Sequence, residues 1–316
     1  MAPITLGIST CLLGEQVRWD GGHKLDRFLT HTLGRFVQYC PVCPEVECGF
    51  GVPREPCQLE GDPQAPRFVT VHTSQDHTER MLRWARRRVQ ELKTEALCGF
   101  IFKGKSPSCG MERIKVYAIE GGTVSKGVGL FARLFMENFP LIPVEDDARL
   151  HDPVLRDNFI ERVFVMKRWR DALRALRPRR SRGELVRFHT RHKLIILSHS
   201  PQHHRVMGRL VAQAGPINAL YDEYERLLRE ALRLKATPAK HDNVLQHIMG
   251  YFKKQLSPDV KAELLEIIAA YRQGNIPLIV PITLLNHYVR LYDQPYLKGQ
   301  YYLHPHPLEL RLRNHV

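Results

Sequence analysis

The cysteines are the residues of this chain best suited to chemistry. All seven lie within the first 109 residues, at positions 11, 40, 43, 48, 57, 98 and 109. Thiolates are soft donors that select zinc, Cu(I) or iron–sulfur clusters. The odd count argues against a complete set of disulfides, and clustered cysteines in a reducing compartment more often bind metal or take part in catalysis. Simple burial stays open, because a free cysteine is often a small core hydrophobe.

One pair of cysteines has a spacing with known uses. Cys40-Pro-Val-Cys43 is a C-x-x-C motif, which occurs as half of a zinc site or as a redox pair. A zinc ribbon needs a second such pair, and the sequence contains none. A thioredoxin-type pair opens a helix, whereas this pair stands among prolines. The spacing alone therefore does not distinguish between a zinc site and a redox pair.

The first half of the chain alternates short β-type runs with helical ones. Apolar patterns predict strands at 4–9, 68–73 and 97–103 and a further strand from residue 114, with a Pro- and Gly-rich loop at 38–53. The helices expected between them are 25–36, 77–93 and 127–139. Such alternation predicts an α/β fold with a mostly parallel sheet and helices on both faces. Ligands of these folds bind at the carboxyl ends of the strands, where Cys11, Cys43 and Cys109 are expected to converge.

The second half of the chain is expected to be all-α. Apolar residues recur there at helical spacing in five segments, 158–176, 182–198, 217–236, 243–256 and 258–274. The net charge of +14 falls entirely within residues 156–316, because the first 155 residues carry equal numbers of acidic and basic side chains. We therefore expect two domains, 1–155 and 160–316, and a polyanion such as nucleic acid as the partner of the second.

Clusters of basic residues in the second half are candidate phosphate contacts, which position nucleic acid without reading its sequence. They are Arg187, Arg191, Lys193, Lys253 and Lys254, with Arg179, Arg180 and Arg182 as a further cluster. The tail pair Tyr301 and Tyr302 are candidates for stacking on bases. His203, His204, His304 and His306 lack cysteines or carboxylates at ligand spacing, so we expect them on an exposed surface.

The sequence predicts a cytoplasmic protein with no membrane partner. No run of 18 apolar residues occurs, and the first apolar stretch lacks the basic flank and cleavage site of a signal peptide. No segment resembles a DNA-reading helix-turn-helix, so a DNA partner is not expected.

Three spaced segments, Ser9–Lys24, Pro41–Pro56 and Gly104–Glu112, resemble the motifs of the thiouracil desulfidase family in their expected order. The resemblance covers about residues 1–145. The segments His189–Pro201 and His241–Lys254 resemble a second domain, of unknown function, that is often fused behind the first. The fused architecture is similar to that of bacterial desulfidases that remove sulfur from 4-thiouridine in transfer RNA.

This resemblance implies a 4Fe-4S cluster held by only three cysteines, Cys11, Cys43 and Cys109. One iron would then stay open as a Lewis acid for a soft thiocarbonyl sulfur. Cys48 is the rival of Cys43 as a ligand.

The catalytic residues expected beside the cluster are Glu45 as general base on water and Ser106 as proton donor or ring contact. Ser108 is next in line for the serine role. Each residue also has a purely structural interpretation, because Glu45 could pair with Arg54 and Ser106 could start a turn.

The expected reaction is non-redox hydrolysis of 4-thiouridine in transfer RNA to uridine and hydrogen sulfide. Two alternatives stay open. The first is desulfuration of a free thiopyrimidine such as 2-thiouracil, and the second is a non-catalytic iron–sulfur regulator.

Overall fold

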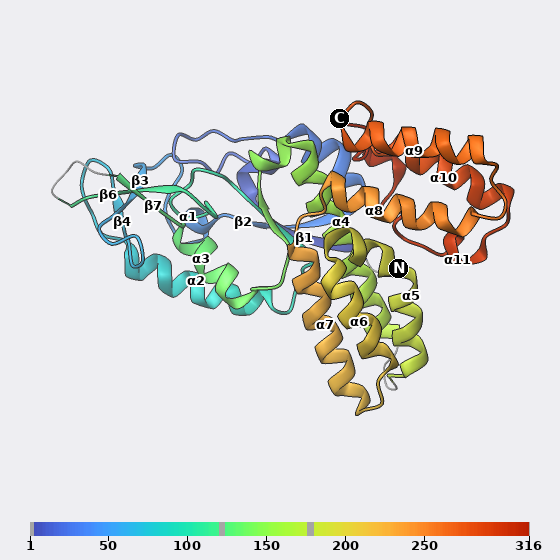
Figure 1. Cartoon of the computed structure of the whole chain (residues 1–316). Helices are drawn as coiled ribbons and strands as arrows, with labels where there is room; N and C mark the ends of the chain where they lie inside the picture. The colour runs from blue at the N-terminus through green and yellow to red at the C-terminus, as the bar shows by residue number, and fades with distance from the viewer. Residues whose placement is uncertain (1–2, 120–123, 176–179, 316) are drawn as a thin grey trace. The chain divides into compact units, whose positions relative to one another are not determined.

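A computed structural model describes residues 3–119, 124–175 and 180–315 of the chain. The chain divides into two compact units, Met1–Leu155 and Arg156–Val316, and each is considered by itself. Figure 1 gives the order of their elements along the chain.

The first unit is built around a parallel sheet with strand order β2-β1-β5-β8. These strands are β1 (Ile4–Ser9), β2 (Val37–Val42), β5 (Gly99–Phe102) and β8 (Val144–Asp146). All three pairings are parallel, with Ser9 opposite Val42 and Ile8 opposite Ile101. The α/β prediction for this part of the chain is therefore confirmed.

A second, mixed sheet has the order β4-β3-β6-β7. It contains β3 (Cys57–Glu60), β4 (Arg67–Thr70), β6 (Ile114–Tyr117) and β7 (Val124–Gly127). Helices α2 (Thr78–Leu92) and α3 (Leu130–Asn138) pack on each other and bury an aromatic core. In that core Phe100, Phe131 and Phe135 contact one another, with ring centres 4.6–6.0 Å apart.

Several elements of this unit differ from the prediction. Residues 38–53 were expected to form a loop, yet they contain most of β2 and the short helix α1 (Pro44–Glu47). Pro41 is compatible with β2 because this strand lies at the edge of its sheet, where a missing N–H is tolerated. The helix expected at 25–36 is present as two short irregular turns, Phe28–Thr32 and Leu33–Arg35.

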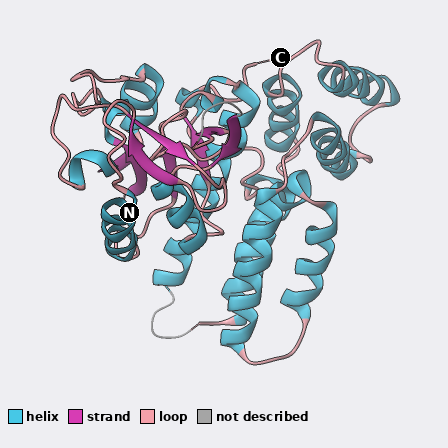
Figure 2. Ribbon diagram, turned by 90° about the vertical axis from the view of Figure 1, so that its left-hand side faces the viewer, coloured by secondary structure: helices cyan, strands magenta, loops and turns pink. Residues whose placement is uncertain are grey.

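The described residues of the second unit form helices and no strand, which confirms the all-α prediction (Figure 2). They are α4 (Pro153–Ala175, whose first residues precede the unit boundary), α5 (Arg182–His199), α6 (Pro201–Ala212), α7 (Ile217–Arg233), α8 (Pro238–Met249), α9 (Pro258–Arg272), α10 (Ile279–Leu291) and α11 (Pro295–Lys298). Helix α6 was not predicted. Ser200 caps it, accepting a hydrogen bond from the His203 N–H, and Pro201 occupies its first turn.

A buried ionic network ties the C-terminal segment to α4. Arg313 donates a hydrogen bond to Glu161 at 2.7 Å, and His306 contacts Asp157 at 3.2 Å. His199 lies 2.9 Å from the other oxygen of Glu161. Because each buried charge has a partner, the network is compatible with its location in the core.

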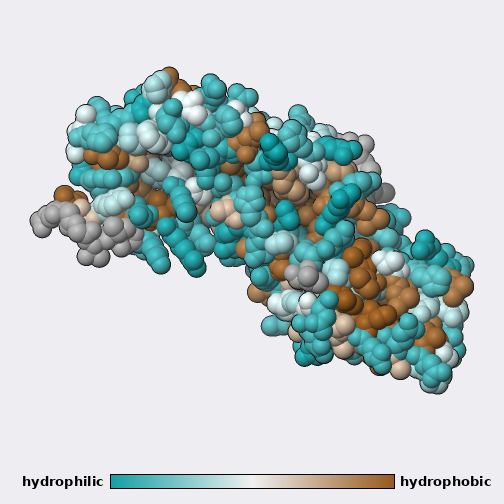
Figure 3. Space-filling model, turned by 90° about the horizontal axis from the view of Figure 1, so that it is seen from above, coloured by the Kyte–Doolittle hydropathy of each residue, from teal (hydrophilic) through white to brown (hydrophobic). Residues whose placement is uncertain are grey.

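No helix of the described ranges is long and apolar enough to cross a membrane. The face of the molecule seen in Figure 3 carries mostly hydrophilic side chains with smaller hydrophobic areas between them.

Candidate active site

Parallel strand register brings the three candidate ligand loops to one edge of the sheet. Cys11 lies two residues beyond the end of β1, and Cys43 follows β2 directly. Because Ser9 pairs with Val42, these two loops leave the sheet side by side. The loop after β5, the neighbour of β1 on its other side, carries Cys109. The expected convergence of the three loops is therefore present.

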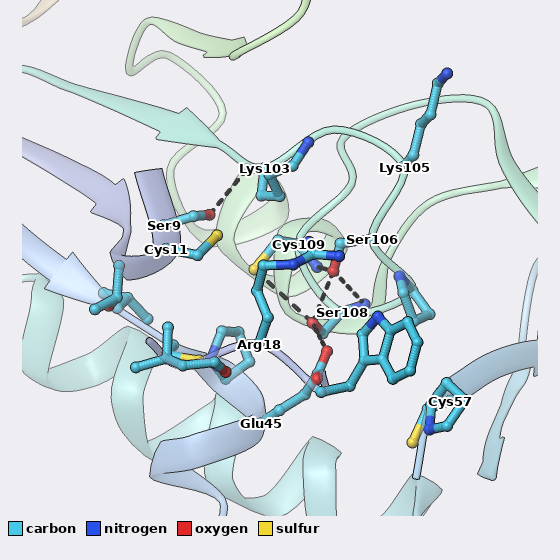
Figure 4. A pocket seen from close by; sticks show the side chains of 18 of the residues that line it. Ser9, Cys11, Arg18, Glu45, Cys57, Lys103, Lys105, Ser106, Ser108 and Cys109 are labelled. Carbon is cyan, nitrogen blue, oxygen red and sulfur yellow. Dashed lines mark hydrogen bonds between the residues drawn. The ribbon is translucent and has the colours of Figure 1, made fainter. Parts of the chain in front are cut away.

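The three loops line one cavity of about 210 Å³. Cys11, Cys43, Cys109, Glu45 and Ser106 all contribute to its lining. Figure 4 shows Cys11 and Cys109 facing each other across it, with Glu45 directed towards Ser108. The sequence-predicted residues of this site are thus neighbours in space.

The three thiols are poor acids in this environment. Burial, followed by the neighbouring Cys43 thiol, raises the pKa of Cys11 to about 11. Burial also raises the pKa of Cys43, and burial together with the other two thiols raises that of Cys109. Three such thiols become thiolates when metal replaces their protons.

The spacing of these donors does not fit a single metal ion. Within residues 3–119, 124–175 and 180–315, no group of three or more His, Cys, Asp or Glu side chains is close enough to hold one. In a cluster each thiolate binds a different iron, so the ligands lie farther apart than around one ion. Three soft donors around a cavity fit a cluster by their chemistry.

The remaining cysteines occupy other surroundings. Cys48 is buried in the core, with its Sγ 3.4 Å from the Arg80 carbonyl oxygen on α2, and does not line the cavity. Cys98 is buried at the start of β5. Cys57 lines the cavity but lies apart from Cys11 and Cys109 (Figure 4). Its pKa is raised to about 12 by burial and then by Glu45.

Glu45 is held by an arginine that comes from a separate loop. The Arg54 side chain donates two hydrogen bonds to Oε2 of Glu45 and a third to the Val17 carbonyl, at 3.0 Å. The pairing considered as the structural alternative is therefore present. This pairing leaves Glu45 able to accept a proton at Oε1. That oxygen accepts one hydrogen bond, from Ser108, and retains a second lone pair.

The two serines form a chain of hydroxyl groups that ends at this carboxylate. Ser108 Oγ donates to Glu45 Oε1 at 2.8 Å, and Ser106 Oγ lies 3.0 Å from Ser108 Oγ. Each hydroxyl has one proton, so Ser106 is the donor in the second contact. Ser106 Oγ also accepts from the backbone N–H of Cys109 at 3.1 Å, which fixes the loop that carries the thiol.

Other contacts hold this loop against the rest of the unit. Lys103 Nζ binds Asp147 at 2.9 Å, and the Lys103 N–H donates to Ser9 Oγ at 2.9 Å. A Cβ at Gly129 would lie 2.6 Å from the carbonyl oxygen of Ser108, so only glycine permits the close approach of α3 to the loop.

Sequence reasoning underrated two residues of the site. Arg54 was considered only as a structural partner of Glu45, and Trp19, which lines the cavity, was not singled out. Both stand inside the matched motifs, in VPREP and VRWDGG, which is the signal that marks them.

The candidate RNA contacts lie on the second unit, and several already have partners within the chain. Arg187 is exposed on α5 and pairs with Glu184. Arg191 lies over the Tyr301 ring at 4.5 Å, and Lys193 over the Tyr296 ring at 4.7 Å. Lys253 and Lys254 are exposed. Arg180 pairs with Asp222, and Arg182 donates to the Gly215 carbonyl. Arg179 lies outside the described residues.

Tyr301 has little ring surface left for a base. Arg168 and Arg191 lie 4.0 and 4.5 Å from its ring centre, and the His192 ring lies 4.5 Å away. Its expected role as a stacking platform is therefore not supported. The exposed guanidinium of Arg191 covers it instead.

Comparison with known protein families identifies both halves of the chain. Residues 6–147 match the profile of the 2-thiouracil desulfurase family. This part of the chain is a domain of that family. Residues 193–307 match a family described as a protein of unknown function, DUF1722. A domain of the desulfurase family is thus fused here to a helical domain, as the motifs indicated, and the match confirms the expected enzyme class, a desulfidase.

Individual relatives match parts of the chain. The uncharacterized protein YbgA of Escherichia coli (strain K12) is 34% identical over 137 residues, which are 42% of this chain and 81% of that protein. The uncharacterized protein YbbK of Bacillus subtilis (strain 168) is 26% identical over 135 residues, 41% of this chain and 88% of that protein. A solved structure of the 4Fe-4S-dependent thiouracil desulfidase TudS is 28% identical and covers 47% of this chain and 94% of its own, with a TM-score of 0.39.

Proposed function

We propose that this desulfidase acts on 4-thiouridine in transfer RNA, with a 4Fe-4S cluster bound by Cys11, Cys43 and Cys109. The observation that carries the proposal is the one cavity that Cys11, Cys43 and Cys109 share with Glu45 and Ser106. When bound, a cluster with three protein ligands supplies an open iron, a Lewis acid that takes the thiocarbonyl sulfur.

Residues of the chain itself activate the water and transfer the protons. Glu45 takes a proton from the attacking water at Oε1, its oxygen with a free lone pair. Once Oε1 carries this proton, both hydroxyls rotate, so that Glu45 donates to Ser108 and Ser108 donates to Ser106. Ser106 then gives its own proton to the pyrimidine nitrogen and receives one from Ser108 in its place. Arg54 keeps the carboxylate in place throughout, because its two hydrogen bonds occupy Oε2 alone. As the carbonyl forms, the ring nitrogen loses its added proton, and this proton and the second proton of the water leave with sulfur. The products are the uridine carbonyl and hydrogen sulfide, with no net redox change.

The charge of the second unit supports RNA as the carrier of the substrate. The whole net positive charge of +14 resides in residues 156–316, and such a charge attracts a polyanion. Arg187, Arg191, Lys193, Lys253 and Lys254 are the proposed phosphate contacts. Arg191, Lys253 and Lys254 are exposed, and within the described part of the chain no carboxylate forms an ion pair with them, which suits them to this role.

A free thiopyrimidine is the second candidate substrate, favoured by the small volume of the cavity, about 210 Å³. The deciding experiment is anaerobic cluster reconstitution followed by assay on thiolated transfer RNA and on free 2-thiouracil. Higher kcat/KM on transfer RNA supports the proposal. Turnover of 2-thiouracil alone replaces it with the free-base reaction, and turnover of neither substrate by cluster-loaded protein favours the regulator.

A further inference from the structure

Trp19 differs from the other tryptophans of the chain. Its side chain is 44% exposed and lines the cavity of the candidate active site. Trp84 and Trp169, the remaining two, are 6% and 0% exposed and belong to the cores of their units. An indole that is half in water beside a polar, thiol-lined cavity leaves a large apolar face unburied in the free protein.

A tight turn presents this indole. The Arg18 N–H donates to the Gly22 carbonyl at 3.2 Å, and the Gly21 N–H donates to the Arg18 carbonyl at 3.0 Å. Asp20 Oδ1 accepts from the Gly22 N–H at 3.0 Å. Gly21 has a φ of +73°, which a glycine adopts without strain. Trp19 is therefore displayed by an ordered turn.

The same arginine that holds the catalytic carboxylate also holds this turn. The Arg54 backbone N–H donates to the Trp19 carbonyl at 2.8 Å, and Arg54 Nη2 donates to the Val17 carbonyl at 3.0 Å. The guanidinium simultaneously binds Glu45. Trp19 and Glu45 are thus fixed relative to each other through one residue.

A cavity of about 210 Å³ whose thiols would also hold a cluster has no room for a stretch of polynucleotide. A base that enters it from RNA must leave its stacked neighbours and gives up the area buried against them. Stacking on an aromatic side chain replaces that area and tolerates any planar ring, because every base has a π face.

We propose that Trp19 is the substrate-binding wall on which the pyrimidine ring stacks, with its thiocarbonyl directed at the three thiols and Glu45. This inference rests on the proposed desulfidase reaction and names the residue that selects a planar ring. It applies equally to a free base and to a nucleotide, since both present the same ring.

The test uses full-length, cluster-loaded protein and two ring-altering variants. Trp19→Phe keeps an aromatic face, whereas Trp19→Leu keeps apolar bulk without one. The first readout is the equilibrium dissociation constant for uracil, the desulfurated ring, which contains no sulfur and so reports ring contacts apart from iron. Trp19→Leu should weaken uracil binding about 10- to 100-fold, the loss of one base–aromatic stack. Trp19→Phe should remain within about threefold of wild type.

The second readout separates substrate binding from chemistry. With 2-thiouracil and with 4-thiouridine monophosphate, Trp19→Leu should raise KM by a similar factor and leave kcat within about threefold. An effect on the monophosphate alone assigns Trp19 to the nucleotide rather than to the ring and overturns the inference.

Fluorescence gives a third readout, since Trp19 is the exposed tryptophan. Uracil should protect wild-type emission from acrylamide and leave the Trp19→Phe emission, which comes from the two buried indoles, unchanged. Uracil binding by Trp19→Leu equal to wild type overturns the stacking role while desulfidase activity stands. Absence of desulfidase activity in the wild type, with the Trp19-dependent uracil binding intact, overturns the reaction and retains the ring site.

Discussion

The hydroxyl of Ser108 lies 2.8 Å from Oε1 of Glu45, although 63 residues separate the two in the chain. The contact joins the loop after β5 to the short helix after β2, and these two strands flank β1 in the parallel sheet. Ser106 extends the contact by one more hydroxyl group, at 3.0 Å from Ser108. The carboxylate is therefore connected to the cavity through a path that can carry a proton.

Breaking this path at either serine should have the same consequence. Ser106→Ala and Ser108→Ala should each lower kcat by about 10- to 100-fold, the loss of one hydrogen bond to a charged group or of its relay. Because both act in one path, the double variant should be no slower than the slower single variant. Single-turnover rates at matched iron content measure this. Losses that multiply in the double variant would show two independent roles.

Replacing Glu45 should separate chemistry from assembly. Glu45→Gln should retain iron and RNA binding and lose turnover by about a hundredfold or more, the usual effect of removing a general base. Glu47→Gln is the matched control on the same helix, because Glu47 binds Arg88 and the Cys43 N–H and does not line the cavity. Wild-type turnover by Glu45→Gln would remove the carboxylate from the mechanism.

The three thiols that line the cavity should each be needed to hold iron. Single Cys11→Ala, Cys43→Ala and Cys109→Ala variants should lose most of their iron and visible absorption after anaerobic reconstitution. Cys48→Ala and Cys57→Ala should retain both, because Cys48 faces α2 and Cys57 lies apart from Cys11 and Cys109. Full iron in Cys43→Ala together with loss in Cys48→Ala would transfer the ligand role to Cys48.

The convergence of Cys11 and Cys109 was predictable because it depends on local signals, whereas the strand that positions Cys43 was not predicted. Apolar runs mark β1 and β5, and parallel strands direct their following loops to one edge of the sheet. The types of residues in those loops then limit the chemistry to soft metals. The fold class of both units follows from the same periodicities of two and 3.6 residues.

What was missed depends on contacts distant in sequence. Strand β2 contains Pro41 and is stabilised by its pairing with β1, so no local pattern marks it. The double role of Arg54 requires the turn at Val17 to lie beside α1. His306, expected at an exposed surface, is instead 8% exposed and bound to Asp157. Its burial arises from the path of the C-terminal segment, which sequence spacing does not encode.

Buried neutral histidines should make the second unit sensitive to mild acid. Burial lowers the pKa of His189 to about 4, of His192 to about 3 and of His241 to about 4. The unfolded chain takes up these protons near pH 6.5, so between about pH 6.5 and 4 it binds more protons than the folded chain. The free energy of unfolding must then fall as pH falls, by roughly 1.4 kcal/mol per histidine at one pH unit below the unfolded pKa.

Thermal unfolding followed by helical circular dichroism measures this dependence. Tm should decrease from about pH 7.5 to about pH 5, and His241→Gln should flatten the decrease while lowering Tm at neutral pH, because its contact with Tyr302 changes. An unchanged Tm over this range contradicts the burial of these imidazoles as neutral groups.

The phosphate contacts can be tested through their dependence on salt. A triple variant should weaken binding of thiolated and unthiolated transfer RNA alike, because contacts with the phosphate backbone of RNA do not depend on the base. Its three changes are Arg187→Gln, Arg191→Gln and Lys193→Gln. The slope of log affinity against log salt should become shallower by roughly 0.7–0.9 for each phosphate that the variant no longer neutralises.

Arg226→Gln is the control, since Glu223 and Glu230 already neutralise this arginine. Turnover of free 2-thiouracil should survive the triple change, because a free base requires only the cavity of the first unit. Normal RNA binding by the triple variant at physiological salt would show that these three residues are not the RNA contacts, and Lys253 and Lys254 would be tested next.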